Sequence, residues 1–103
     1  MLNAKQALLA AAQVFEDYPK RWTTNVYARD KGGVATNPGS PTAYCFCAEG
    51  IFMQMAAEDL ITREVSEKIY NKIMLTNGNR HIPNLNDDLG REAVIEMFRK
   101  AAK

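Results

Sequence analysis

The stretch SPTAYCFCAEGIF, residues 40–52, holds both cysteines of the chain and decides how its central part folds. Ser40 followed by Pro41 is typical of a helix start, because serine can cap free amides and proline has no amide hydrogen to satisfy. We therefore predict a helix from Pro41 to about Ala57. Its wide apolar face indicates the central helix of the fold, and that face contains Tyr44, Cys45, Ala48, Ile51, Phe52, Met55 and Ala56.

Gly50 lies in the middle of this predicted helix, where glycine costs about 1 kcal/mol relative to alanine. The close approach of another backbone segment would explain it, and a β-hairpin just upstream is the expected neighbour. That hairpin is predicted between about Thr23 and Thr36. The glycines of Asp30-Lys31-Gly32-Gly33 supply the positive φ that a tight turn requires.

Two further helices have clear ends. Asn3 can cap a helix that runs to about Tyr18 and is stopped by Pro19. Thr62 can cap another, which ends at Asn77-Gly78. Inward-facing residues recur at helical spacing in both helices; they are Leu8, Ala11, Ala12, Phe15 and Tyr18 in the first, and Val65, Ile69 and Ile73 in the second.

The segment NRHIPNLNDD, residues 79–88, is predicted to be extended or looped because Pro83 disfavours helix. Asp87 or Asp88 would then cap a last helix. The predicted fold is a mainly helical α+β domain spanning residues 1–103, with about four helices and a small β-hairpin after the first.

Composition excludes several classes of protein. The 103 residues are 47% hydrophobic and 24% charged, as in an ordinary soluble domain. Thirteen basic and twelve acidic residues leave a net charge of +1, which gives no strong nucleic-acid signal. No apolar run reaches the roughly 18–20 residues of a membrane span, and the N-terminal segment does not fit a signal peptide. We therefore expect a cytoplasmic protein with no membrane association.

The two thiols have alternative interpretations. On the predicted helix Cys45 and Cys47 would point about 200° apart, and the chain has a single histidine and no CxxC pair, so we expect neither a metal nor a cofactor. Cys45 in a first helical turn could be a nucleophile, because His81 and then Asn84, Asn86 or Asp87 follow in the order of Cys-His-Asn hydrolases. The favoured interpretation is that both are buried core residues, which is common for free cysteines, and that His81 is an exposed or capping residue.

A polar cluster is the predicted binding site. It draws on the hairpin and on the start of the final helix, with complementary charges; its members are Trp22, Arg29, Asp30, Asp87 and Arg91. Arg29 is expected to pair with a carboxylate, and the candidates are Glu49, Asp87 and Asp88. We predict that the hairpin docks on the final helix start, bringing Arg29 near Asp87 or Asp30 near Arg91. A structural role and a ligand-binding role for this cluster both remain open.

Several short motifs occur in a recognisable order. They are Trp22-Thr23, Ala28-Arg29-Asp30 with Gly33, Phe46-Cys47-Ala48-Glu49-Gly50, and Asn86-Asp87-Asp88-Leu89-Gly90-Arg91. With these motifs the chain resembles a family of small bacterial and phage proteins known only as a domain of unknown function. The sequence differs from the family pattern at two positions. Phe46 stands where the family often has tryptophan, and Glu49 stands where the family residue is usually apolar. The resemblance makes Cys47 the family-like cysteine and implies no activity, substrate or cofactor.

Two functions follow as hypotheses. The preferred one is a small non-enzymatic accessory or modulator protein that binds another protein, of the kind that a phage or mobile element encodes. Small size, near-zero net charge and the lack of a catalytic spacing favour it. The alternative is a thiol-dependent hydrolase or transferase that uses Cys45 or Cys47 with His81. Self-association is left open.

Overall fold

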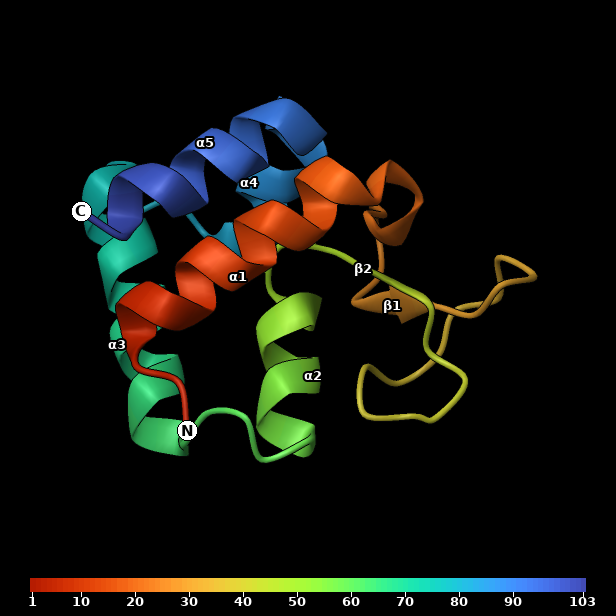
Figure 1. Ribbon diagram of the computed structural model, residues 1–103. Coiled ribbons are helices and arrows are strands. Elements are labelled where there is room, and N and C mark those ends of the chain that lie inside the picture. The colour runs from red at the N-terminus through yellow and green to blue at the C-terminus, as the bar shows by residue number, and fades with distance from the viewer.

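The computed structural model describes all residues, 1–103 (Figure 1). It contains five α-helices, one short 3-10 helix and one two-stranded antiparallel sheet. In chain order they are α1 (Ala4–Asp17), η1 (Pro19–Arg21), β1 (Ala28–Arg29), β2 (Cys45–Phe46), α2 (Gly50–Ala57), α3 (Arg63–Thr76), α4 (Ile82–Leu89) and α5 (Arg91–Ala101). The mainly helical α+β prediction is confirmed, with five helices where about four were expected.

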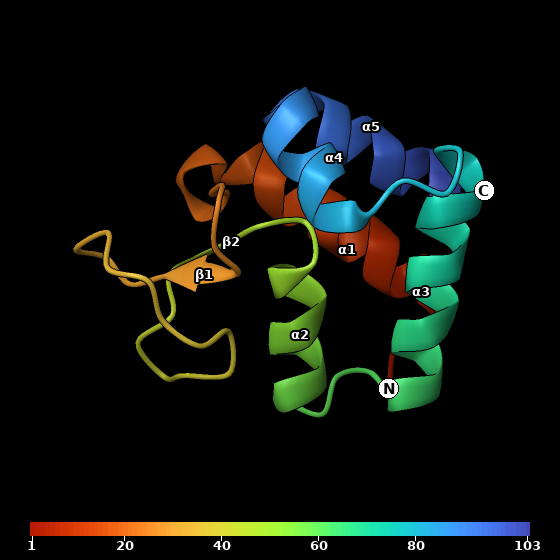
Figure 2. The same cartoon turned by 180° about the vertical axis from the view of Figure 1, so that it is seen from behind.

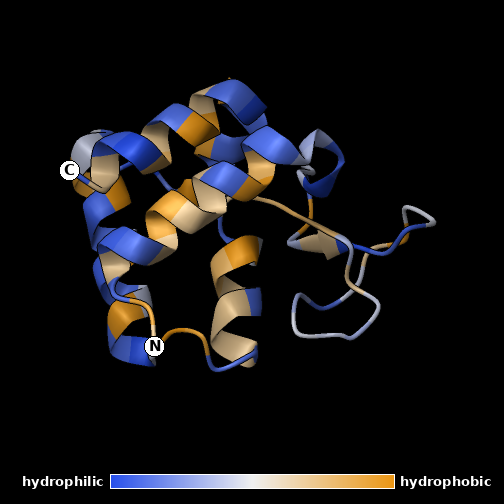
Figure 3. Ribbon diagram, viewed as in Figure 1, coloured by the Kyte–Doolittle hydropathy of each residue, from blue (hydrophilic) through white to orange (hydrophobic).

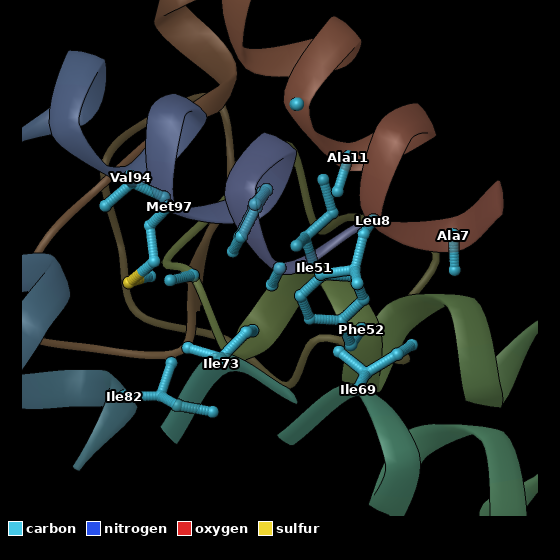
Figure 4. Packing of buried hydrophobic residues seen from close by; sticks show 14 of the residues in the cluster. Ala7, Leu8, Ala11, Ile51, Phe52, Ile69, Ile73, Ile82, Val94 and Met97 are labelled. Atoms are coloured by element: carbon cyan, nitrogen blue, oxygen red, sulfur yellow. The ribbon is translucent and has the colours of Figure 1, made fainter. Parts of the chain in front are cut away.

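The helices surround one apolar core. In Figures 1 and 2, α1 lies along α5 and crosses α2 and α3, which stand side by side, while the strands and their loops extend to the far side of α2. Phe98 lies at the centre, with its ring centroid 5.1 Å from that of Phe52 and 6.1 Å from that of Phe15. Figure 4 shows apolar side chains from every α-helix packed in this core.

The starts of α1 and α3 confirm two of the capping predictions. Asn3 accepts the amide of Gln6 at 2.8 Å, and the Gln6 side chain accepts the amide of Asn3 at 2.9 Å. This reciprocal pair satisfies two amides that the helix leaves free. Thr62 caps α3 through the amide of Val65 at 3.1 Å, and Gly78 follows that helix with φ 67°.

The central helix is shorter than predicted. It begins at Gly50, and the preceding Cys45–Phe46 forms a strand antiparallel to Ala28–Arg29. Ser40 does not cap a helix, because its hydroxyl accepts the Thr42 amide at 3.3 Å within a local turn. Backbone bonds to the first strand replace helical bonds here, since the Cys47 amide donates to Tyr27 O at 3.1 Å.

The predicted hairpin is correct only in its turn. Asp30 and Val34 close that turn through a 2.9 Å backbone bond, and one isolated bridge joins Arg29 to Ala35. The main strand partner of Ala28–Arg29 is instead Cys45–Phe46. The sheet therefore encloses a long connection, residues 30–44, which we call the arm.

The region around Pro83 was predicted wrongly. It forms α4, with Pro83 in the first turn, where a helix does not need that amide. Asp87 and Asp88 consequently lie inside α4 and do not cap the last helix. Gly90, with φ 88°, separates the two helices, and α5 begins at Arg91.

Gly50 confirms the predicted close approach of backbone, although it begins α2 and does not lie inside it. A Cβ atom at this position would lie 1.9 Å from Tyr27 O, which no side chain can tolerate. The contact holds the start of α2 directly against Tyr27, the residue before β1. No helix combines the length and apolarity needed to cross a bilayer.

Candidate functional site

The buried side chain of Asn86 joins three segments of the chain. Its Oδ1 accepts hydrogen bonds from Trp22 Nε1 at 2.7 Å and from the Ala48 amide at 2.9 Å. Its Nδ2 donates to Thr23 O at 3.0 Å and to Asp87 Oδ1 at 3.1 Å. All the hydrogen-bonding capacity of this amide is used, at an exposure of 0%. We call this arrangement the Asn86 junction.

The Asn86 junction brings Trp22 and Asp87 together, two of the five residues predicted as a binding site. Asp87 Oδ1 also accepts the amide of Asn25 at 3.0 Å, a residue with φ 70°. The segment after α1 therefore lies against α4, whereas the prediction placed the hairpin against the start of the final helix. The sequence analysis missed Asn86 as the connecting residue because Pro83 argued against a helix there.

Arg29 lies at the base of the arm and binds main-chain and hydroxyl oxygens. Its Nε donates to Thr23 Oγ1 at 3.1 Å, and its two terminal nitrogens donate to Gly33 O at 3.0 Å and Thr24 O at 3.3 Å. The predicted carboxylate pairing is wrong, because no ion pair joins Arg29 to Glu49, Asp87 or Asp88. The guanidinium instead ties the arm to the preceding segment.

Asp30 and Arg91 do not meet either. Asp30 Oδ1 accepts the amides of Gly32 at 2.9 Å and Val34 at 3.0 Å, so it fixes the turn of the arm. Arg91 donates to Phe15 O at 2.8 Å, which connects α5 to the end of α1. The five predicted residues therefore belong to three separate arrangements: Trp22 and Asp87 at the Asn86 junction, Arg29 and Asp30 in the arm, and Arg91 at the end of α1. The predicted ion pairs between them are absent.

The arm leaves the helical body, as Figures 1 and 2 both show, and its colours in Figure 3 are mostly hydrophilic to neutral. Its backbone is nevertheless held in place. Pro38 is buried, and Gly39 packs so closely on Ala57 that an added Cβ would lie 3.1 Å from its side chain. The Gly39 amide also donates to Asn37 Oδ1 at 2.8 Å. Most residues of the arm tip, by contrast, are exposed, and Val34 is 64% exposed.

Aromatic and cationic side chains gather where the arm returns to the body. The Tyr44 ring centroid lies 4.8 Å from the Arg21 guanidinium carbon and 5.5 Å from Lys31 Nζ. Both distances fall within the range of cation–π attraction. Tyr18 stands nearby, 63% exposed, and lines with Lys20 and Tyr44 a shallow cavity of about 320 Å³. We call this surface the Tyr44 face; its residues are Tyr18, Lys20, Arg21, Lys31 and Tyr44.

Both thiols are free and buried, as the core interpretation predicted. Cys45 lies in β2, so the argument that a helix start activates it is wrong, and its Sγ donates to Arg29 O at 3.8 Å. Cys47 Sγ accepts the Gly50 amide at 3.3 Å, and burial raises the pKa of this thiol. Cys47 lines a cavity of about 280 Å³ together with Asp87.

His81 and Asn84 are both exposed at the start of α4, as expected for His81. The hydrogen bonds of the two thiols go to backbone groups, and neither involves His81. No group of three or more His, Cys, Asp or Glu side chains is placed to hold a metal ion. The structure therefore shows no assembled Cys-His-Asn constellation.

Comparisons of the chain with protein-family models, with curated proteins and with solved structures found no match. The resemblance to the small bacterial and phage family stays a prediction.

Proposed function

We propose that the protein is a non-enzymatic accessory protein that binds a partner protein through the arm and the adjoining Tyr44 face. The observation that carries this proposal is the contrast within the arm between a fixed backbone and exposed side chains. Arg29 and Asp30 alone contribute five hydrogen bonds that hold this connection. A loop already held in one shape loses little conformational entropy on binding, which favours affinity.

The chemistry of the Tyr44 face favours an acidic segment of the partner. Arg21 and Lys31 both place positive charge within cation–π distance of the Tyr44 ring, and tyrosine and arginine are enriched among residues that dominate binding energies. Carboxylates of the partner would pair with these cations while an apolar side chain covers the ring. Two carboxylates also line cavities at this face: Asp30 does so with Lys31 and Tyr44, and Asp17 with Lys20 and Tyr44.

The proposal extends to the biological setting. The resemblance to phage-borne proteins supports a modulator that acts on a protein of the host cell. The small size and the net charge of +1 fit a chain whose role is contact with one partner.

Affinity purification with a matched pair of variants tests the proposal. Lys31→Glu reverses a charge on the Tyr44 face, and Lys72→Glu makes the same change on the exposed surface of α3. We expect the wild-type chain and Lys72→Glu to retain one stoichiometric partner, and Lys31→Glu to lose it. Retention of the partner by Lys31→Glu, or recovery of no partner from the native host, would contradict the proposal.

The thiol-dependent alternative has its own test. We expect iodoacetamide at neutral pH to leave both cysteines unmodified until the protein unfolds, because both are buried and the pKa of Cys47 is raised. Free glutathione labelled in parallel gives the reference rate. Labelling of either cysteine faster than glutathione would replace the accessory function with a thiol-dependent one.

A further inference from the structure

The carboxylate of Glu49 has no partner within the chain. Glu49 directly precedes α2, is half-buried, and takes part in none of the ion pairs of the structure. Burial raises its pKa, and the nearby His81 only partly offsets that effect. A carboxylate removed from water without a donor or cation is costly. The carboxylate of Glu49 is thus partly withdrawn from water and has no cation paired with it.

A cavity of about 200 Å³ lies against this carboxylate. Its polar walls are Glu49, Tyr70 and His81, and its apolar walls are Met74, Ile82 and Pro83. Burial, followed by the charge of Glu49, raises the pKa of Tyr70 to about 12, so its ring stays neutral. The cavity thus combines one anionic group, one neutral aromatic ring and a short apolar wall. We call it the Glu49 pocket.

We propose that the Glu49 pocket binds an organic cation, namely an ammonium or guanidinium group at the end of a short alkyl chain. Glu49 would accept hydrogen bonds from the cation, which are stronger than those between neutral groups. The Tyr70 ring would add cation–π attraction, and the apolar wall would cover the methylene groups. A lysine or arginine side chain and a free alkylamine share this chemistry.

The neighbouring groups define how binding should vary with pH. His81 lines the pocket together with Glu49. Protonation of Glu49 itself would remove the attracting charge. Tyr70 and the buried Cys47 stay neutral at these pH values because both have raised pKa values. Affinity for the cation should therefore fall as the pH is lowered.

Titration with n-propylguanidinium chloride, followed by amide NMR spectra at about pH 7.5, tests the site. We expect shift changes confined to the α2 start and to residues 70–74 and 81–83, with n-butanol, an uncharged molecule of similar length, causing none. Glu49→Gln should weaken binding at least about tenfold, while Glu58→Gln, an exposed glutamate next to the other end of α2, should not. Tyr70→Leu, which removes the ring and keeps an apolar side chain, should weaken binding as well.

The proposal is overturned if the cation causes no localised shifts, if n-butanol causes the same ones, or if Glu49→Gln binds as the wild-type chain does. Thermal melting of each variant verifies that it is folded, and Tyr70→Leu supplies a second readout if Glu49→Gln is not. The experiment needs no partner protein. Lys31→Glu should keep full affinity for the cation, so failure of the Glu49 pocket and failure of the proposed protein-binding function are separate results.

Discussion

The helical body and the segment between α1 and α2 are held together by different forces. In the body, Phe15, Phe52 and Phe98 are fully buried, and stability comes from removing apolar surface from water. In residues 22–48, a few polar side chains fix the backbone, chiefly Asn86 and Arg29. Apolar packing stabilises a region only when its side chains are buried. Hydrogen bonds, by contrast, can fix the backbone of a loop and leave its side chains free for a partner. Substitutions in the two regions should therefore lower the free energy of unfolding by different amounts.

The largest loss is expected in the body. Phe52→Ala should lower the free energy of unfolding by about 3–5 kcal/mol, because it leaves a cavity beside the Phe98 ring. Val34→Ala in the arm is the control and should change it by less than about 0.5 kcal/mol. Urea denaturation followed by circular dichroism measures both. If both variants lowered the free energy of unfolding by similar amounts, the two regions would not differ in how they are stabilised.

The next largest effect is expected at the Asn86 junction. Asn86→Leu removes the acceptor of the Ala48 amide and of Trp22 Nε1, and should cost about 2–4 kcal/mol. Trp22 is the single tryptophan of the chain, so its fluorescence reports this site directly. Asn84→Ala, an exposed change on the same helix, should cost less than about 0.5 kcal/mol. Unchanged Trp22 emission in Asn86→Leu would show that the hydrogen bond does not position the indole.

The sequence predicted the elements whose ends depend on local chemistry. Asn3 and Thr62 act on amides within three residues, so spacing alone identifies α1 and α3. The strand at Cys45–Phe46 was missed because its partner is far back in the chain: Arg29 lies 16 residues before Cys45, and Ala28 lies 18 residues before Phe46. Local propensity cannot report such a long-range pairing.

The candidate site was predictable only in part, for a related reason. The motif analysis placed Trp22 and Asp87 in one cluster, but the pairs that it predicted were Arg29 with Asp87 and Asp30 with Arg91. The connection is the neutral amide of Asn86, and its role depends on the helix that Pro83 obscured. Glu49 was predicted as a candidate partner of Arg29, and the structure shows no ion pair at its carboxylate. Its cavity depends on α3 and α4 meeting, which no local pattern shows.

A smaller effect is expected in the arm. Asp30→Ala removes the acceptor of the Gly32 and Val34 amides in an exposed turn, and should cost about 1 kcal/mol. Hydrogen exchange should become faster at these two amides and stay unchanged in α1 and α5. Asp30→Asn keeps a side-chain oxygen and should retain most of the protection. Faster exchange throughout the body would show that the arm is part of the cooperative core.

The smallest effect on stability is expected at Glu49. Whether Glu49→Gln stabilises or destabilises the chain shows whether the carboxylate is unpaired or paired in the folded state. Burial raises the pKa of Glu49 in the folded chain above its usual value of 4.5, so the folded state holds this proton more tightly than the unfolded state does. Stability from this group is therefore present below the unfolded pKa and is lost as the pH rises through the folded pKa. Glu49→Gln removes that loss, so it should be more stable than the wild-type chain at about pH 7, and the difference should disappear below about pH 4. Urea midpoints measured across this range, with Glu58→Gln as the exposed control, give the answer. A less stable Glu49→Gln at about pH 7 would mean that the carboxylate already has a favourable partner in the folded chain, and the need for an external cation would be gone.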